Sequence, residues 1–219
     1  RYWDCRFNDN KNLIEENEYY SDSTLSQKWI NKYDKKGNRL EKIQYDSDGK
    51  LFMKRIYKYD EKGNLIETNT SYSHERFDST LMVYKYDENG NLIEENEINS
   101  DGSITLMYAH KYDKNDNRFE VKSYDSDGGL RWTYKYDEKG NRIEEKKYNS
   151  DGSLKSKLTY KYNEKGNRIE LNEYNSGGSL VLNKTYKYEF DEQMNWIKKI
   201  IFEDDIPMYI LEREYEYYD

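Results

Sequence analysis

Short runs of alternating polar and apolar residues cover most of the 219-residue chain, and sequences rich in Asp, Asn and Gly separate them. In the clearest copy, Tyr134-Lys135-Tyr136 precedes Asp-Glu-Lys-Gly-Asn, and Arg-Ile-Glu follows it. Alternation with a period of two predicts half-buried β-strands. The unit recurs eight times, with its turn Asn at residues 12, 38, 64, 91, 117, 141, 167 and 195. The pattern predicts an all-β fold of tandem β-hairpins, roughly sixteen strands in one twisted antiparallel sheet, extended or coiled.

The first turn of each unit, Asp-x-x-Gly-Asn, has the composition of a tight hairpin turn. Its Asp can accept a hydrogen bond from the backbone two residues further on, and its Gly adopts a positive φ without steric cost. Lys11, Asp116 and Met194 replace this glycine in three units. Asp tolerates the left-handed conformation, whereas Lys11 and Met194 should each cost about 1 kcal/mol unless the turn changes type.

A second turn, for example Asp46-Ser47-Asp48-Gly49, recurs between units. Residues 72–80 depart from it and predict a longer, irregular loop. The last unit holds the only proline, Pro207, which lacks a backbone donor and suits an edge strand. We expect one hairpin array over residues 1–219, ending in a degenerate C-terminal cap at 195–219.

Charged residues indicate the strand register. Lys135 stands six residues before the turn Asn and Glu144 three after it, and in the last unit both signs reverse. A direct cross-strand pair explains the joint reversal, and it would also place Tyr136 opposite Ile143. The turn chemistry favours another register, a three-residue loop with a Gly bulge that places Lys135 opposite Ile143. We expect the charge-matched register.

Aromatic and apolar positions conflict in phase. An aromatic residue stands five before the turn Asn in every unit, and an apolar residue stands two after it. Most units carry Tyr seven residues after the Asn, on the opposite parity to that apolar residue. Either a bulge shifts the phase in the second strand, or aromatic side chains cover both faces.

Composition indicates a thin, two-faced sheet. Only 34% of residues are hydrophobic and 37% are charged, with a mean hydropathy of -1.31, but 25 tyrosines can bury area while their hydroxyls stay hydrated. The net charge of -8 disfavours nucleic acid and anionic membranes as partners. No apolar run approaches the ~20 residues of a membrane span. A single Cys5 excludes an internal disulfide.

The unit resembles the YD repeat of Rhs-type bacterial proteins, whose core reads Tyr-x-Tyr-Asp-x-x-Gly-Arg-Leu. Tyr136, Asp137 and Gly140 match this core, Asn141 stands where the family has Arg, and the period here is longer. The resemblance covers nearly the whole chain. It implies a secreted or cell-surface bacterial β-repeat, in a family whose repeats form spiralling sheets that bind carbohydrate or enclose toxin segments. The family has no catalytic residues in these repeats, so none is transferred.

Residues able to do chemistry are sparse, and we expect neither enzymatic activity nor a cofactor. Cys5 and His110 stand where other units have Tyr, which favours strand packing, and His74 lies in the irregular loop. No Cys/His spacing suits zinc. Residues 113–117 look like the start of a calcium loop, but they occupy the ordinary turn position and lack a distal Glu.

One row of aromatic residues is the candidate ligand-binding site. Nine residues before the turn Asn, five units carry Trp3, Trp29, Tyr108, Trp132 and Tyr186. Aromatic planes flanked by Asp, Asn and Lys could stack on sugar rings and hydrogen-bond their hydroxyls. The alternative is that these rings only cover the sheet.

The sequence therefore predicts a non-enzymatic, secreted or cell-surface repeat module that binds a polysaccharide, another polymer or a protein partner. One alternative is a carbohydrate-binding module that uses the aromatic row. Another is a scaffold fragment of a larger Rhs-type toxin or adhesin, with no ligand of its own. An exposed apolar face would predict homo-oligomers or a protein partner.

Overall fold

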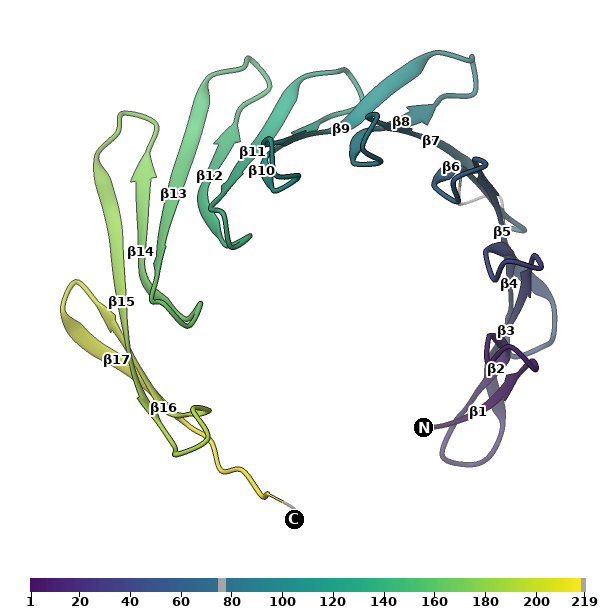
Figure 1. Cartoon of the computed structure of the whole chain (residues 1–219), viewed down its shortest axis with the longest axis horizontal. Helices are drawn as coiled ribbons and strands as arrows, with labels where there is room; N and C mark the ends of the chain where they lie inside the picture. The colour runs from purple at the N-terminus through teal and green to yellow at the C-terminus, as the bar shows by residue number, and fades with distance from the viewer. Residues whose placement is uncertain (75–77, 218–219) are drawn as a thin grey trace. The chain divides into compact units, whose positions relative to one another are not determined.

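The computed structural model describes residues 1–74 and 78–217. These residues form an all-β fold of 17 strands, in which consecutive strands pair as antiparallel hairpins (Figure 1). The predicted fold class is confirmed. By its contacts the chain divides into two compact units, unit 1 (Arg1–Met107) and unit 2 (Tyr108–Asp219). The predicted irregular loop within residues 72–80 lies partly outside the described residues.

Unit 1 holds eight strands and the start of a ninth, which continues into unit 2. The strands are β1 (Tyr2–Phe7), β2 (Leu13–Tyr19), β3 (Leu25–Tyr33), β4 (Arg39–Tyr45), β5 (Leu51–Tyr59), β6 (Leu65–Tyr72), β7 (Thr80–Tyr86), β8 (Leu92–Ile98) and β9 (Ile104–Tyr112).

Unit 2 contains the rest of β9 and eight further strands. They are β10 (Arg118–Tyr124), β11 (Leu130–Tyr136), β12 (Arg142–Tyr148), β13 (Leu154–Tyr162), β14 (Arg168–Asn175), β15 (Leu180–Phe190), β16 (Trp196–Glu203) and β17 (Ile206–Glu212). The predicted cap region begins at the turn before β16, and Pro207 lies in β17 opposite Phe202.

Each first turn is closed by its first residue, which is Asp or, at positions 8 and 163, Asn, and by its final Asn. In the copy at residues 34–38, the Asp34 N–H donates to the Asn38 carbonyl at 2.9 Å, and the Gly37 N–H donates to the Asp34 carbonyl at 3.2 Å. The Asp34 carboxylate accepts from the backbone N–H groups of Lys36 and Asn38, both at 2.8 Å, and from Asn38 Nδ2 at 2.9 Å. These bonds, the Asn38 amide foremost, hold the pKa of Asp34 below its usual value.

Substituted turns keep the same geometry. Lys11 has a φ of 60°, Asp116 of 61° and Met194 of 67°, and the Met194 N–H still donates to the Asp191 carbonyl at 3.1 Å. The turns therefore do not change type, and the predicted left-handed strain is present at Lys11 and Met194.

The strand register combines both expectations from the sequence. Lys135 pairs with Glu144, as predicted, but Tyr136 pairs with Arg142, so the predicted pairing of Tyr136 with Ile143 is wrong. Ile143 is the extra residue of a bulge, because the three-residue turn and the charge pair differ in register by one residue. Equivalent bulges leave out the apolar residue of every described unit: Ile14, Leu40, Ile66, Ile93, Phe119, Ile143, Ile169 and Ile197. A bulge in the second strand was one of the two explanations for the phase conflict, and the structure contains it.

Tyrosine hydroxyls join successive hairpins at these bulges. Tyr162 Oη donates to the Arg142 carbonyl at 2.9 Å, directly before the bulge residue of the preceding hairpin. The same bond joins Tyr33 to Leu13, Tyr59 to Arg39 and Tyr86 to Leu65. In the last unit Phe190 stands five positions before the turn Asn, and Tyr188, seven positions before it, donates to the Arg168 carbonyl instead. The bulge interrupts the ladder at this carbonyl, and the phenol supplies its partner. This contact accounts for the tyrosine five positions before the turn Asn in the units that form it.

One face carries a ladder of ion pairs. Glu41 lies between Lys32 at 2.7 Å and Lys54 of the next hairpin at 3.3 Å, and the hydrogen bond to Lys32 is the largest cause of its lowered pKa. In the last unit the pair is Lys198 with Glu189, at 3.7 Å, which confirms that both signs reverse together. The buried apolar side chains are few (Met53, Val121, Tyr160 and Tyr186), as expected of a thin sheet.

Candidate functional site

The predicted aromatic row is split between the units. Trp3 lies on β1 and Trp29 on β3 in unit 1, and the other three residues lie on β9, β11 and β15. In unit 2, Tyr108 and Trp132 both pair with Ser123 of the strand between them, so they lie on one cross-strand line. Because all these residues are at equivalent register positions, the repeat places them on the same type of face within each unit.

Trp3 and Trp29 form an accessible aromatic pair. Their ring centroids are 6.0 Å apart with an interplanar angle of 29°, and Trp3 is 53% exposed. Trp29 pairs across the strands with Glu16 on one side and Gln44 on the other. Stacked indole rings beside carboxylate and amide groups can stack on a sugar ring and hydrogen-bond its hydroxyls.

Polar groups beside this pair are already organised. Gln44 Nε2 donates to Gln27 Oε1 at 2.6 Å, and Arg1 Nη1 lies 2.9 Å from Glu18 Oε1. Glu18 is buried although Arg1 is exposed. This hydrogen bond uses one donor of Gln44 and one acceptor site of Gln27, and a primary amide has two donors and two acceptor sites.

In unit 2, cations cover the corresponding rings. Lys147 Nζ lies 4.6 Å from the centre of the Trp132 ring. Tyr186 is buried, and Arg168 and Lys199 lie 4.9 Å and 5.0 Å from its ring centre. These contacts occupy the ring faces that a sugar would need. The structure therefore brings together Trp3 and Trp29, and it does not present Trp132 or Tyr186 as open platforms.

Tyr108 is intermediate in accessibility between the Trp3–Trp29 pair and the covered rings of unit 2. It is exposed and stacks on His110, with ring centroids 6.4 Å apart. His110 itself is buried in β9, Cys5 is exposed on β1, and His74 is exposed at the start of the irregular loop.

The turn at residues 113–117 uses its carboxylate internally. Asp113 Oδ1 accepts from the N–H groups of Asn115 at 2.8 Å and Asn117 at 3.0 Å, and Oδ2 accepts from Asn117 Nδ2 at 3.2 Å. These bonds, led by the Asn117 N–H, lower the pKa of Asp113. Within residues 1–74 and 78–217, no three His, Cys, Asp or Glu side chains cluster as metal ligands would. The same residues contain no helix that is long and apolar enough to cross a membrane.

Sequence reasoning missed a second surface, the grooves between successive first turns. One groove of about 580 Å³ lies between the turns at 137–141 and 163–167, with Ile143, Ile169 and Tyr162 in its lining, and Lys139 Nζ crosses it to the Glu164 carbonyl at 3.4 Å. An equivalent groove of about 380 Å³ in unit 1 is lined by residues of the turns at 34–38 and 60–64.

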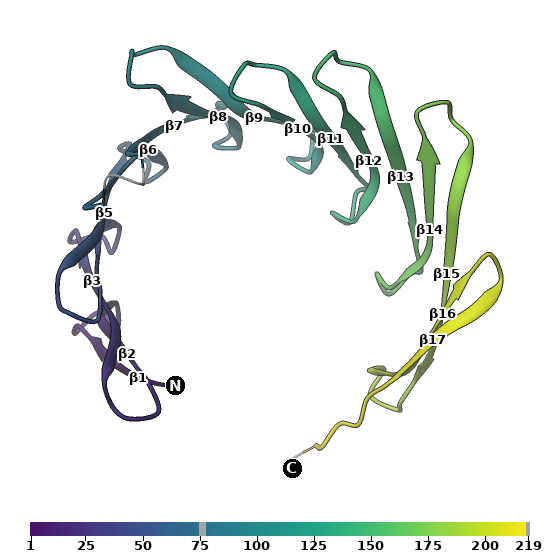
Figure 2. The ribbon, with the colours of Figure 1, turned by 180° about the vertical axis from the view of Figure 1, so that it is seen from behind.

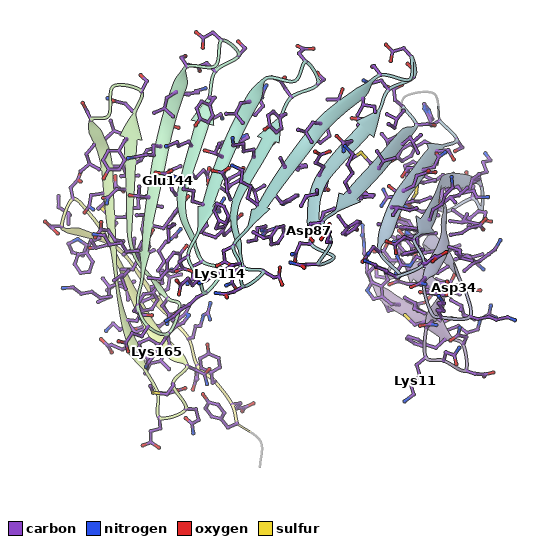
Figure 3. The ribbon with its side chains drawn as sticks, turned by 45° about the horizontal axis from the view of Figure 1, so that its top comes forward. Lys11, Asp34, Asp87, Lys114, Glu144 and Lys165 are labelled. Atoms are coloured by element: carbon purple, nitrogen blue, oxygen red, sulfur yellow. The ribbon has the colours of Figure 1, made fainter. Side chains whose placement is uncertain are left out.

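Exposed bulge residues lie beside these turns. The side chains of Leu40, Ile66, Phe119, Ile143 and Ile169 are all exposed. In unit 2, Lys114 and Lys165 lie on turns at the same end of the strands, while Glu144 lies on a strand (Figure 3). The sequence held a signal for this surface, because the Gly-bulge turn and the charge pair can both be satisfied only if the residue between them is left unpaired.

Comparison with known proteins gives a family match over part of the chain. Residues 19–70 match a family described as a protein of unknown function (DUF2963). No curated protein matches the chain.

Three solved structures are similar over most of this chain. The crystal structure of TcdB2-TccC3 without its hypervariable C-terminal region is 14% identical, with a TM-score of 0.41, over 92% of this chain and 12% of that chain. The Tc holotoxin pore of Photorhabdus luminescens is 12% identical, with a TM-score of 0.19, over 91% and 15%. A porin-like protein from Bacteroides uniformis is 11% identical, with a TM-score of 0.25, over 90% and 86%. The chain thus spans less than a sixth of either toxin chain.

Proposed function

We propose that this β-hairpin repeat chain is a non-enzymatic module, secreted or at the cell surface, that binds an extended partner along its repeats. The observation that carries the proposal is the recurrence of one exposed arrangement, an apolar bulge residue beside a turn groove with charged rims, as at Leu40 in unit 1 and Ile143 in unit 2. A partner with a repeating structure can contact several such positions at once, so weak contacts add up to useful affinity.

A carbohydrate polymer is the partner best supported by the aromatic residues. Trp3 and Trp29 form a stacked pair with polar groups at its edge, and Trp3 is largely accessible. The resemblance to YD repeats points to the same ligand class. The carbohydrate site is therefore assigned to unit 1, and the covered rings of Trp132 and Tyr186 are assigned to packing.

Tryptophan fluorescence titrated with soluble bacterial and host polysaccharides tests this assignment. We expect a saturable shift that Trp29→Ala abolishes. The matched control is Trp132→Ala, which should keep the shift because Lys147 covers that ring. If no polysaccharide of the panel shifts the fluorescence while circular dichroism shows an intact fold, the carbohydrate hypothesis is excluded. A protein partner or a scaffold function then remains.

A scaffold function is the second candidate, and the use of the recurring polar groups favours it. The turn Asp residues bind their own backbone, and the strand Glu residues pair with neighbouring lysines, as Asp34 and Glu41 do. The hydrogen bonds and ion pairs of these groups therefore stabilise the sheet itself, and they do not leave these groups oriented for a ligand. Sequencing the complete gene would separate the candidates, since a scaffold fragment should continue into more repeats or a C-terminal effector.

A further inference from the structure

The strand β17 exposes an apolar edge in unit 2. All seven of its residues are exposed, and Ile206, Tyr209 and Ile210 keep 62%, 60% and 61% of their accessible surface. It folds back on β16 through a turn in which Asp204 and Asp205 have φ values of 47° and 65°. Figure 2 shows β17 beside β16, its partner among the described strands.

Another edge strand in the protein is chemically different. β1 is also fully exposed, but Asp4 and Arg6 interrupt its aromatic residues. Charges of this kind discourage pairing with other chains. In β17, six uncharged residues run from Ile206 to Leu211 before Glu212. Pro207 removes one backbone donor near the start of the strand and leaves the following residues able to extend a ladder. A long, exposed, apolar edge is a template for strand addition.

The paired edge of β17 shows which chemistry the strand accepts. Ile200 and Ile201 of β16 pair with Ile210 and Tyr209, and Lys198 pairs with Glu212, with its Nζ 3.9 Å from the carboxylate. The side chains of a strand contact the neighbouring strands on both sides. The open edge of β17 therefore favours the same sequence of apolar and basic residues.

We propose that the open edge of β17 takes up an extended strand from a protein partner, apolar opposite Tyr209 and Ile210 and carrying Lys or Arg opposite Glu212. Carboxylates outnumber cations at both ends of this edge: Asp204 and Asp205 lie on one side beside Glu203, which pairs with Lys184 at 3.2 Å, and Glu212 and Glu214 flank Arg213 on the other. A second copy of the chain would bring these acidic ends together, so a partner with a basic residue opposite Glu212 is favoured over a second copy. The inference rests on the proposed binding function, and it specifies the kind of protein segment that would bind.

A fluorescent peptide copy of β16, residues 196–203, is a direct probe. Its anisotropy, titrated with the whole chain, should saturate at one peptide per chain. Ile210→Lys should weaken binding of the peptide at least tenfold, because it places a charged side chain on the edge, opposite the apolar residues of the peptide. Val181→Lys is the matched control: Val181 is also exposed, at 54%, but lies on β15, which pairs with β14 and β16, so binding should be unchanged.

A charge exchange tests the register. Glu212→Lys should weaken binding of the β16 peptide, which carries the lysine copied from Lys198. A second peptide with Glu in place of that lysine should bind the Glu212→Lys variant as the first peptide binds the unchanged chain. Absent binding, equal losses in Ile210→Lys and Val181→Lys, or chain self-association that depends on Ile210 would each overturn the proposal. If the peptide fails while the polysaccharide titration succeeds through Trp29, only the β17 inference fails, because the two probes use different units.

Discussion

The aromatic faces of the two units are built on the same strand positions but are covered by different side chains. In unit 2, Arg142 lies over Tyr134 and Tyr160, at 5.3 Å and 5.5 Å from the ring centres, and Arg168 lies over Tyr160 and Tyr186, at 5.8 Å and 4.9 Å. Each arginine thus bridges the rings of two successive hairpins. Guanidinium groups held between aromatic rings contribute to stability and also exclude other molecules from those rings.

In unit 1, Arg39 makes the same kind of bridge, 6.0 Å and 5.9 Å from the ring centres of Tyr33 and Tyr57, but smaller polar residues occupy another part of the face. Asn31 stands at the position of Tyr134, and Thr68 stands at the position of Glu145, and both are buried. The stacked pair of Trp3 and Trp29 lies at the end of this face, and no cation of the described residues lies over its rings as Lys147 lies over Trp132. The difference shows that turns and register maintain the repeat, while the residues between them decide whether a unit packs or presents its rings.

The largest effect on this comparison should come from Arg168→Ala. Loss of a cation between two rings should destabilise unit 2 by about 2 kcal/mol. Hydrogen exchange resolved along the chain should show faster exchange in β13 to β16 and unchanged exchange in unit 1. Arg131→Ala is the matched control, since Arg131 is exposed and lies 3.8 Å from Asp125. Equal protection in the two variants would show that the cation does not stabilise the face.

The hydrogen bond from the tyrosine hydroxyl to the carbonyl before the bulge should contribute equally to the stability of both units. Tyr162→Phe in unit 2 and Tyr59→Phe in unit 1 each remove a 2.9 Å bond to a carbonyl of the preceding hairpin. Each should cost about 1 kcal/mol in chemical denaturation. A loss in only one unit would mean that the bond is not a common element of the repeat.

The substituted turns offer one stabilising change in each unit. Lys11→Gly and Met194→Gly remove a side chain from a left-handed position, with φ values of 60° and 67°. Each should raise the free energy of unfolding by about 1 kcal/mol or less, because glycine also gains freedom in the unfolded chain. Gly140→Ala, at a φ of 79°, should do the reverse. A gain from Gly140→Ala would contradict the strain argument.

The smallest expected effect is a difference between the two units in how their stability falls at alkaline pH. Burial, aided by the charge of Glu145, raises the pKa of Tyr160 to about 12. Burial also raises the pKa of Tyr134 and Tyr162 in unit 2 and of Tyr59 in unit 1. The folded state favours the neutral phenol, so this stability is complete below the unfolded pKa of about 10 and is lost as pH rises towards about 12.

Denaturation followed by tyrosinate absorbance on either side of that range should therefore show a loss of stability, and hydrogen exchange should place it mainly in unit 2. Tyr160→Phe should reduce the pH dependence, because Phe has no proton to lose. An identical pH dependence in the variant would exclude Tyr160 as a source.

Much of the fold could be predicted from local chemistry. The Asp-x-x-Gly-Asn turns depend on residues within five positions, and so does the positive φ of Met194. The pairing of Lys135 with Glu144 was also visible, because the sign reversal in the last unit linked two positions. A bulge in the second strand was one of the predicted alternatives, but its position at Ile143 was missed because the turn and the charge pair were treated as competing registers, whereas one extra residue satisfies both.

The accessibility of the candidate site depended on tertiary structure. Trp29 and Trp132 are equivalent in sequence, yet Trp29 stacks on Trp3 while Lys147 covers Trp132. The strand edge at β17 likewise became a candidate surface only when its exposure was known. The sequence by itself determined the hairpins, their turns and their charge pairing, because those interactions are local or repeat along the chain. Only the tertiary structure decided which rings and edges remain open, because the covering groups come from neighbouring strands whose side chains vary from unit to unit.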